Sequence, residues 1–155
     1  MRQLPTLLML LTLAFSSSAN DETDIENVLD SLHHFASEAS AEQYFSLYAD
    51  NAVFIGTDAA ETWTLEEFKR YAMPYFSKGQ GWTYTSTDRN IYFSDANDVA
   101  WFVEILESES LGVTRGTGVL QKYGDKWLIE QYHLTLPVPN ALIDDVAAQI
   151  QEQAR

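Results

Sequence analysis

Cysteine is absent from this chain of 155 residues, and basic side chains are scarce, with 9 Lys and Arg against 23 Asp and Glu. Without cysteine the protein can form no disulfide, thiol nucleophile or cysteine-linked lipid anchor. The formal net charge of −14 opposes binding to phosphate backbones and anionic lipids, which are recognised mainly by Lys and Arg. We therefore expect no nucleic-acid partner, and a fold that is held together by its core alone.

Long hydrophobic runs are also missing, because no segment approaches the roughly 20 apolar residues that a transmembrane helix needs. Residues 7–15 (LLMLLTLAF) form a short apolar run that follows Arg2 and precedes the small residues Ser17, Ser18 and Ala19. This pattern is typical of a secretory signal peptide, with an uncleaved anchor as the alternative. We predict a signal peptide over 1–19, one domain over 20–155 without a membrane anchor, and a periplasmic or secreted location.

The spacing of apolar residues changes along the chain. Apolar residues make up 46% and aromatic residues 13% of the sequence, which is typical of one globular domain. The apolar period is 3.6 up to residue 77 and 2 afterwards, so helices should precede antiparallel strands. Thr64 and Glu67 have the spacing of a capping box. The predicted helices are 22–38, 41–49, 65–77 and a C-terminal one from 142, and the predicted strands are 52–56, 82–94, 99–108, 114–123 and 126–136.

Several short strings carry a resemblance to a known family. They are residues 53–58 (VFIGTD), 99–102 (VAWF), 115–120 (RGTGVL), 127–129 (WLI) and 137–140 (PVPN). Over residues 22–140 the chain resembles the SnoaL-like group of the nuclear transport factor 2-like superfamily. The resemblance implies an α+β cone, in which three N-terminal helices pack on a curved antiparallel sheet around a cavity, plus a C-terminal helix. Because this superfold includes enzymes, binding proteins and dimerising modules, it leaves the function open.

Alternation along the strands then suggests which side chains face the cavity. By the resemblance, the strand residues on the same faces as Ile129 and Val119 point inward. Glu104 interrupts an otherwise apolar row, so it should meet a cation or lie at the cavity mouth. The candidate ligand-binding residues are Asp58, Glu61, Trp63, Trp101, Glu104, Arg115, Gln131 and His133.

Three roles are open for these polar candidates. Glu104, His133 or Asp58 could transfer a proton while Arg115 stabilises an oxyanion. Alternatively, Glu104 and Arg115 form a buried ion pair while His133 is hydrogen-bonded in the core, or the pocket binds a ligand without chemistry. We expect the Glu104–Arg115 pair. Asp58 and Glu61 lie on a loop, where they could contact a ligand, or cap a turn and remain solvated.

Other charged residues favour simpler interpretations. His33 and His34 point about 100° apart on a helix, which favours a solvated surface over a metal site. Arg89 lies in a strand and could reach an acidic group, although a solubilising surface charge is the simpler interpretation. No phosphate-binding loop or other cofactor motif is present. We expect neither a metal nor a cofactor.

Two classes of function remain after these arguments. The first is an exported protein whose small apolar cavity binds a small hydrophobic molecule, with acid–base chemistry of an isomerase or cyclase type as a further alternative. The second is an interaction module that forms a homodimer through the outer face of the sheet. The aromatic residues expected at that interface are Tyr84, Tyr92, Trp101 and Tyr132.

Overall fold

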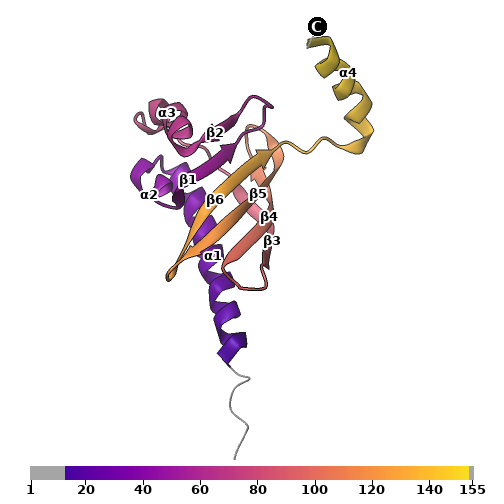
Figure 1. Ribbon diagram of the computed structural model, residues 1–155. Coiled ribbons are helices and arrows are strands. Elements are labelled where there is room, and N and C mark those ends of the chain that lie inside the picture. The colour runs from indigo at the N-terminus through magenta and orange to yellow at the C-terminus, as the bar shows by residue number, and fades with distance from the viewer. Residues whose placement is uncertain (1–12, 154–155) are drawn as a thin grey trace, which may run out of the picture.

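A curved six-stranded sheet wraps around one long helix (Figure 1). The computed structural model describes residues 13–153, with side chains from residue 20 onward. The strands are β1 (Tyr48–Ile55), β2 (Thr62–Thr64), β3 (Thr85–Phe93), β4 (Val99–Ser108), β5 (Gly112–Tyr123) and β6 (Lys126–Thr135). Their order is β2-β1-β6-β5-β4-β3, and within it only the β1–β6 pair is parallel. The predicted α+β cone is confirmed.

The long helix α1 (Leu13–Ser37) fills the concave side of the sheet. Ile25, Leu29, Leu32 and Ala36 recur at helical spacing, and each is at most 2% exposed. Near the start of the described side chains, the buried carboxylate of Asp21 accepts hydrogen bonds from Lys122 and from the Trp127 indole. Of the predicted signal peptide, residues 1–12 lie outside the described residues, and α1 continues through the predicted cleavage point.

Two shorter helices cover the wide end of the cone. The helix α2 (Ala41–Phe45) is shorter than predicted, because Tyr48 already belongs to β1. The Tyr44 and Tyr48 hydroxyls nevertheless lie 3.1 Å apart, as expected for residues at one buried site. The helix α3 (Leu65–Phe76) begins with the predicted capping box, in which Thr64 and Glu67 each bind the other's backbone N–H. The capping box therefore holds the first turn of α3 directly after β2.

A β-bulge in β6 decides which of its side chains face inward. Leu120 pairs with Ile129 but Val119 pairs with Gln131, so Glu130 is the extra residue. Ile129 is buried on the concave side, and beyond the bulge Tyr132 takes that side. Because the bulge shifts the alternation by one residue, the inward position predicted for residues beyond Glu130 is wrong.

The last helix stands apart from the cone. A 3-10 turn (Asn140–Leu142) leads into α4 (Ile143–Gln153), which contains no buried residue and extends beyond the sheet (Figure 1). Its start agrees with the predicted C-terminal helix. Among the described residues, no helix combines the length and apolar character that crossing a membrane requires.

Candidate functional site

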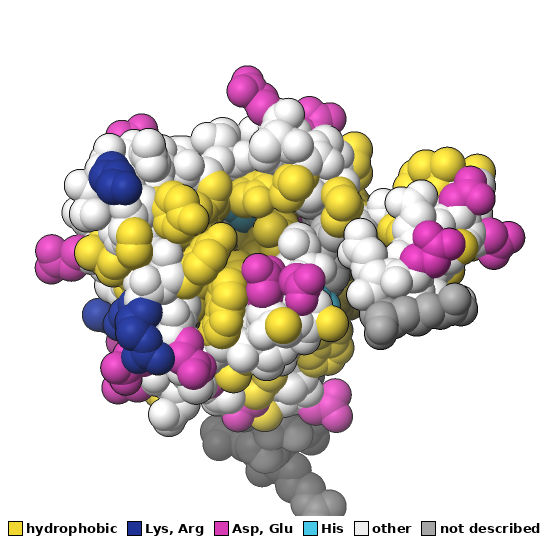
Figure 2. Space-filling view, turned by 90° about the horizontal axis from the view of Figure 1, so that it is seen from above, with side chains coloured by type: hydrophobic (Ala, Val, Ile, Leu, Met, Phe, Trp, Pro, Cys, Tyr) yellow, Lys and Arg dark blue, Asp and Glu magenta, His cyan; other side chains and the backbone are white. Residues whose placement is uncertain are grey.

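The candidate site is a pocket at the wide end of the cone. Figure 2 shows it as a hollow lined by hydrophobic side chains, with a histidine visible at its floor. The cavity measures about 270 Å³. Its walls come from α1, α3, β1, β6 and the segment before β3. Residues distant in sequence therefore meet here because the helices close one end of the curved sheet.

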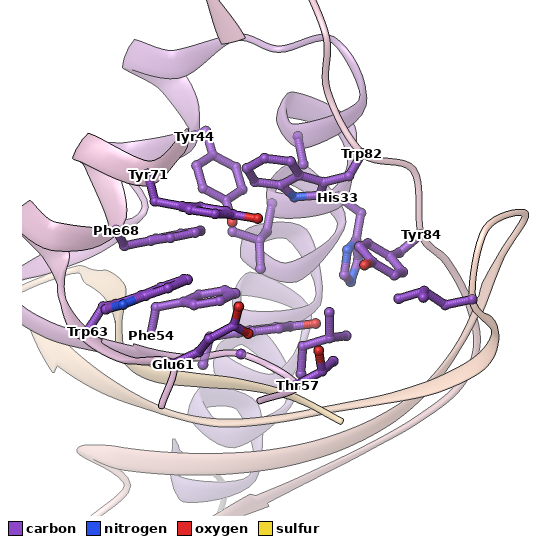
Figure 3. Close-up of a pocket in the computed structure, with 16 residues that line it drawn as sticks. His33, Tyr44, Phe54, Thr57, Glu61, Trp63, Phe68, Tyr71, Trp82 and Tyr84 are labelled. Carbon is purple, nitrogen blue, oxygen red and sulfur yellow. The ribbon is translucent and has the colours of Figure 1, made fainter. Parts of the chain in front are cut away.

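One wall of the pocket is a layered set of nearly parallel aromatic rings (Figure 3). Phe54 and Phe68 stack with centroids 3.8 Å apart at 10°, and Trp63 stacks on Tyr71 at 4.8 Å and 28°. The Tyr132 ring continues the set, 6.0 Å from Phe54 at 11°. Rings that share one orientation form a flat apolar surface, which suits a flat ligand.

Beneath the pocket, the carboxylate of Glu104 is fully buried and bound on both oxygens. Its Oε1 accepts a hydrogen bond from the Tyr132 hydroxyl at 3.0 Å and lies 2.9 Å from His33 Nε2. Its Oε2 accepts from Arg89 Nε at 3.0 Å and lies 2.9 Å from Nη2. Arg89 Nη1 also donates to Asp30 at 2.8 Å. A buried charge is tolerated when it is paired and hydrogen-bonded in this way.

The network sets the ionisation of its members. Burial would raise the pKa of Glu104, but His33 and the Arg89 guanidinium outweigh it and hold that pKa below its ordinary value. Burial, together with the charge of Glu104, raises the pKa of the Tyr132 hydroxyl well above normal. Glu104 is therefore ionised at neutral pH while Tyr132 keeps its proton.

Because Glu104 is ionised, His33 must present an N–H to it through Nε2. His33 also lines the pocket, and among the described residues its Nδ1 has no hydrogen-bond partner. A histidine whose ring is oriented by a carboxylate is a common general base or acid. The floor could thus move a proton, whereas no three His, Asp or Glu side chains among the described residues could share a metal ion.

A second carboxylate, that of Glu61, lies at the pocket mouth. Glu61 is half-buried and lines the cavity, and its Oε2 accepts only the Asp58 backbone N–H, at 3.2 Å. It has no ion-pair partner within residues 20–153. The pKa of the nearby Tyr71 hydroxyl is raised by burial, by Tyr75 and by Glu61. The mouth therefore carries an unpaired negative charge among aromatic rings.

The predicted site residues divide between the pocket and other places. Glu61 and Trp63 line the cavity, and Glu104 lies directly below it. Asp58 takes the turn-capping alternative, since its Oδ1 accepts from Ala60 N at 2.8 Å. Trp101 is 46% exposed and stacks on Tyr92, outside the cavity.

Three predicted residues, Arg115, Gln131 and His133, lie on the outer face of the sheet. The predicted Glu104–Arg115 pair is wrong: Glu104 is opposite Gly116, whose inward position leaves Arg115 exposed on the other face. A Cβ at Gly116 would lie 2.8 Å from Glu104 Oε1, so glycine there leaves room for the carboxylate. Gln131 and His133 follow the bulge and face outward with Val119 and Thr117.

Two residues of the predicted dimer interface are inside the pocket instead. Tyr132 is 4% exposed at the floor, and Tyr84 lines the cavity. Only Tyr92 and Trp101 of that set are exposed, at 47% and 46%, on the outer face.

Sequence reasoning assigned His33 and Arg89 to the surface, although two signals could have placed them. His33 lies four residues after Leu29 and three before Ala36, so it borders the buried stripe of α1. Arg89 is directly opposite Glu104 across the β3–β4 hairpin. Counting back from residues 95–98, which separate the predicted strands 82–94 and 99–108, would have given that pairing.

Replacing Glu104 by glutamine should leave the Arg89 guanidinium without its buried counter-charge, with only the exposed Asp30 still paired to it. We expect Glu104→Gln to lower the free energy of unfolding at pH 7 by about 3–5 kcal/mol, measured by urea denaturation. The exposed Glu107→Gln on the same strand is the control, with a change below about 0.5 kcal/mol.

The same pair of proteins tests the ionisation of Glu104. Since its folded pKa lies below the ordinary 4.5, the stabilisation is present above that value and is lost as pH falls through the lowered pKa. The stabilities of wild type and Glu104→Gln should therefore converge in acid. A gap that stays constant down to pH 2 would contradict the assignment.

Comparison with known proteins agrees with this fold. An NTF2-like protein of unknown function from Pseudomonas putida KT2440 is 14% identical, with a TM-score of 0.66 over 79% of this chain and 90% of that one. A candidate scytalone dehydratase from Novosphingobium aromaticivorans is 10% identical, with a TM-score of 0.68 over 80% of this chain and 89% of that one. A domain of unknown function with a cystatin-like fold from Nostoc punctiforme is 16% identical, with a TM-score of 0.65 over 87% of this chain and 92% of that one.

At these identities the likeness shows the fold alone, and no match is found among proteins of curated function. The model of the SnoaL-like domain, however, matches residues 25–139. This match covers the second half of α1, the helices α2 and α3, the whole sheet and the pocket described above. The chain therefore belongs to the family of SnoaL-like domains.

Proposed function

We propose that the pocket binds a small, flat, largely apolar organic molecule. The observation that carries this proposal is the layer of parallel rings, Phe54, Phe68, Trp63 and Tyr71, along one side of a 270 Å³ cavity. At ~30 Å³ per water molecule, that volume equals about nine waters. A ligand of one or two rings would fit such a space. A short N-terminal apolar run favours export, so we propose that the ligand is bound outside the cytoplasm.

A few polar groups would orient the ligand within this apolar space. His33 and Tyr132 lie at the floor and Glu61 at the mouth. Binding sites of this kind combine mostly apolar walls with a small number of convergent polar groups. A polar substituent would then be directed either to the floor or to the mouth, while the ring lies against the aromatic wall.

Binding of 2-naphthol, a flat two-ring probe, tests this proposal. Trp63→Leu removes one stacking ring, and we expect roughly three- to tenfold weaker binding by isothermal titration calorimetry, the range for one aromatic contact. Trp101→Leu makes the same change on the outer face and should bind like wild type. No binding by wild type, or equal losses in both variants, would contradict a binding role for the pocket.

Proton transfer at the pocket floor is a second candidate function. The specific observation is that Glu104 orients His33, which faces the cavity with Nδ1 unoccupied among the described residues. A similar structure from Streptomyces avermitilis is named as a candidate dehydratase of the NTF2-like family. Dehydration and isomerisation both require a base that removes a proton next to a polar group.

The ketone 2-tetralone would report such a base, because its two-ring body carries exchangeable protons beside the carbonyl. We expect the protein to accelerate the replacement of these protons by deuterium in D₂O, and proton NMR measures the rate. His33→Gln should lower the protein-catalysed rate by about 10²–10⁴-fold, the usual contribution of a general base. His34→Gln, at the exposed neighbouring position, is the control. An unchanged rate in His33→Gln would sink this candidate.

We also propose that the outer face of the sheet forms a homodimer. A row of side chains crosses four strands in register, with Tyr92, Trp101, Val119 and Gln131 as its members. Tyr92 and Trp101 stack on each other with both rings nearly half exposed. Exposed aromatic residues on the face of a sheet are typical of protein interfaces.

Multi-angle light scattering at micromolar concentration tests the dimer. A charge at the centre of the row should be poorly tolerated in a desolvated interface, so Trp101→Glu should shift a dimer toward the monomer mass. Tyr75→Glu alters an equally exposed aromatic residue on α3 and should leave the mass unchanged. A wild-type protein that is monomeric at all concentrations would contradict the proposal.

A further inference from the structure

The pocket lining has an acidic side chain but no Lys or Arg, and its His33 is already paired with the buried Glu104. The carboxylate of Glu61 is the one acidic group of the lining. A half-buried carboxylate with no counter-ion in the described part of the chain is costly unless a ligand or water compensates it. An anionic ligand would add repulsion to that cost, whereas a cation would remove it.

Aromatic faces around Glu61 supply the second half of a cation site. Figure 3 shows its side chain beside the rings of Phe54 and Trp63, with Tyr71 at the other end of the layered rings. Glu61, Trp63 and Tyr71 all line the cavity, and because Trp63 and Tyr71 stack at 4.8 Å, each ring covers one face of the other. The electron-rich faces of Trp and Tyr attract ammonium groups, most strongly where water is excluded.

The charges below the floor do not oppose a cation. Glu104 and Asp30 provide two carboxylates, and both bind the single guanidinium of Arg89. The whole chain is acidic, with 23 Asp and Glu against 9 Lys and Arg, so its long-range field also favours cations over anions. The local and overall electrostatics therefore agree.

We propose that the natural ligand is a small organic cation, an ammonium group attached to an apolar or aromatic body. The body lies against the ring stack, and the ammonium is held at the mouth by the Glu61 carboxylate, beside the rings of Trp63 and Tyr71. This rests on the proposed binding function and adds the charge of the ligand to it. It also gives the Glu61 carboxylate a role beyond its one hydrogen bond to the Asp58 backbone N–H.

Choline and 3,3-dimethyl-1-butanol test the charge directly, because they have nearly the same shape and differ in the positive nitrogen. Calorimetric titration of the full-length protein should show at least about tenfold tighter binding of choline, as expected for a partly desolvated cation–π contact with a carboxylate. In Glu61→Gln, which keeps the oxygen that accepts the Asp58 N–H, the preference should fall below about threefold. Equal affinity of wild type for both probes, or no binding of choline, would overturn the inference.

Two controls separate this result from other causes. Glu22→Gln removes the same charge from an exposed position on α1, away from the pocket lining, and should retain the full preference. Tyr71→Leu removes a ring at a 46% exposed position. It should weaken the binding of choline more than the binding of 3,3-dimethyl-1-butanol. If Glu22→Gln loses the preference as strongly as Glu61→Gln, the effect is general attraction to an acidic protein, and the site is wrong.

The 2-naphthol titration distinguishes failure of this inference from failure of the proposed function. If 2-naphthol binds and Trp63→Leu weakens it, but choline shows no preference, the pocket binds neutral molecules and only the cation assignment falls. If neither probe binds, both proposals fall.

Discussion

The buried carboxylate of Glu104 is the interaction on which the site depends. It joins three parts of the chain that are distant in sequence, with His33 on α1, Arg89 on β3 and Tyr132 on β6. A charge with no access to water must have its partners in place, so these elements cannot shift independently. The same contacts orient His33 and Tyr132 toward the cavity. The stability of the cone and the chemistry of its floor are therefore properties of one network.

Charged and apolar side chains are separated along the depth of the pocket. Ion pairing is confined beneath the floor, while the walls are rings that pack mostly with one another, such as Phe54 with Phe68. The layered rings form most of one apolar wall, and leucine side chains complete the lining. The ionisable and hydrogen-bonding groups at the two ends are His33 and Tyr132 below and Glu61 above. A ligand with one polar end would be recognised by its direction as well as by its shape.

Sequence patterns predicted the elements well and the contacts between them less well. The capping box at Thr64 and the strand at 99–108 depend on neighbours in sequence, and both are confirmed. Which side chains of β6 face inward depends on a single extra residue, Glu130, and no local sequence pattern predicts this bulge. His33 was assigned to solvent because its partner, Glu104, lies 71 residues away. Pairing across such distances follows from sheet register, which periodicity alone does not set.

The parallel pairing of β1 with β6 has a consequence for how the protein reaches this structure. β6 is the last strand in the chain, yet it lies between β1 and β5. β1 and β2 therefore have no edge to join until residue 135 is present, whereas the hairpins of β3 to β6 can form among near neighbours. Loop closure over such a separation is slow, so this join should come late in folding. Phe54 and Trp63 lie on these two strands, so the pocket wall is completed only when the chain is nearly finished.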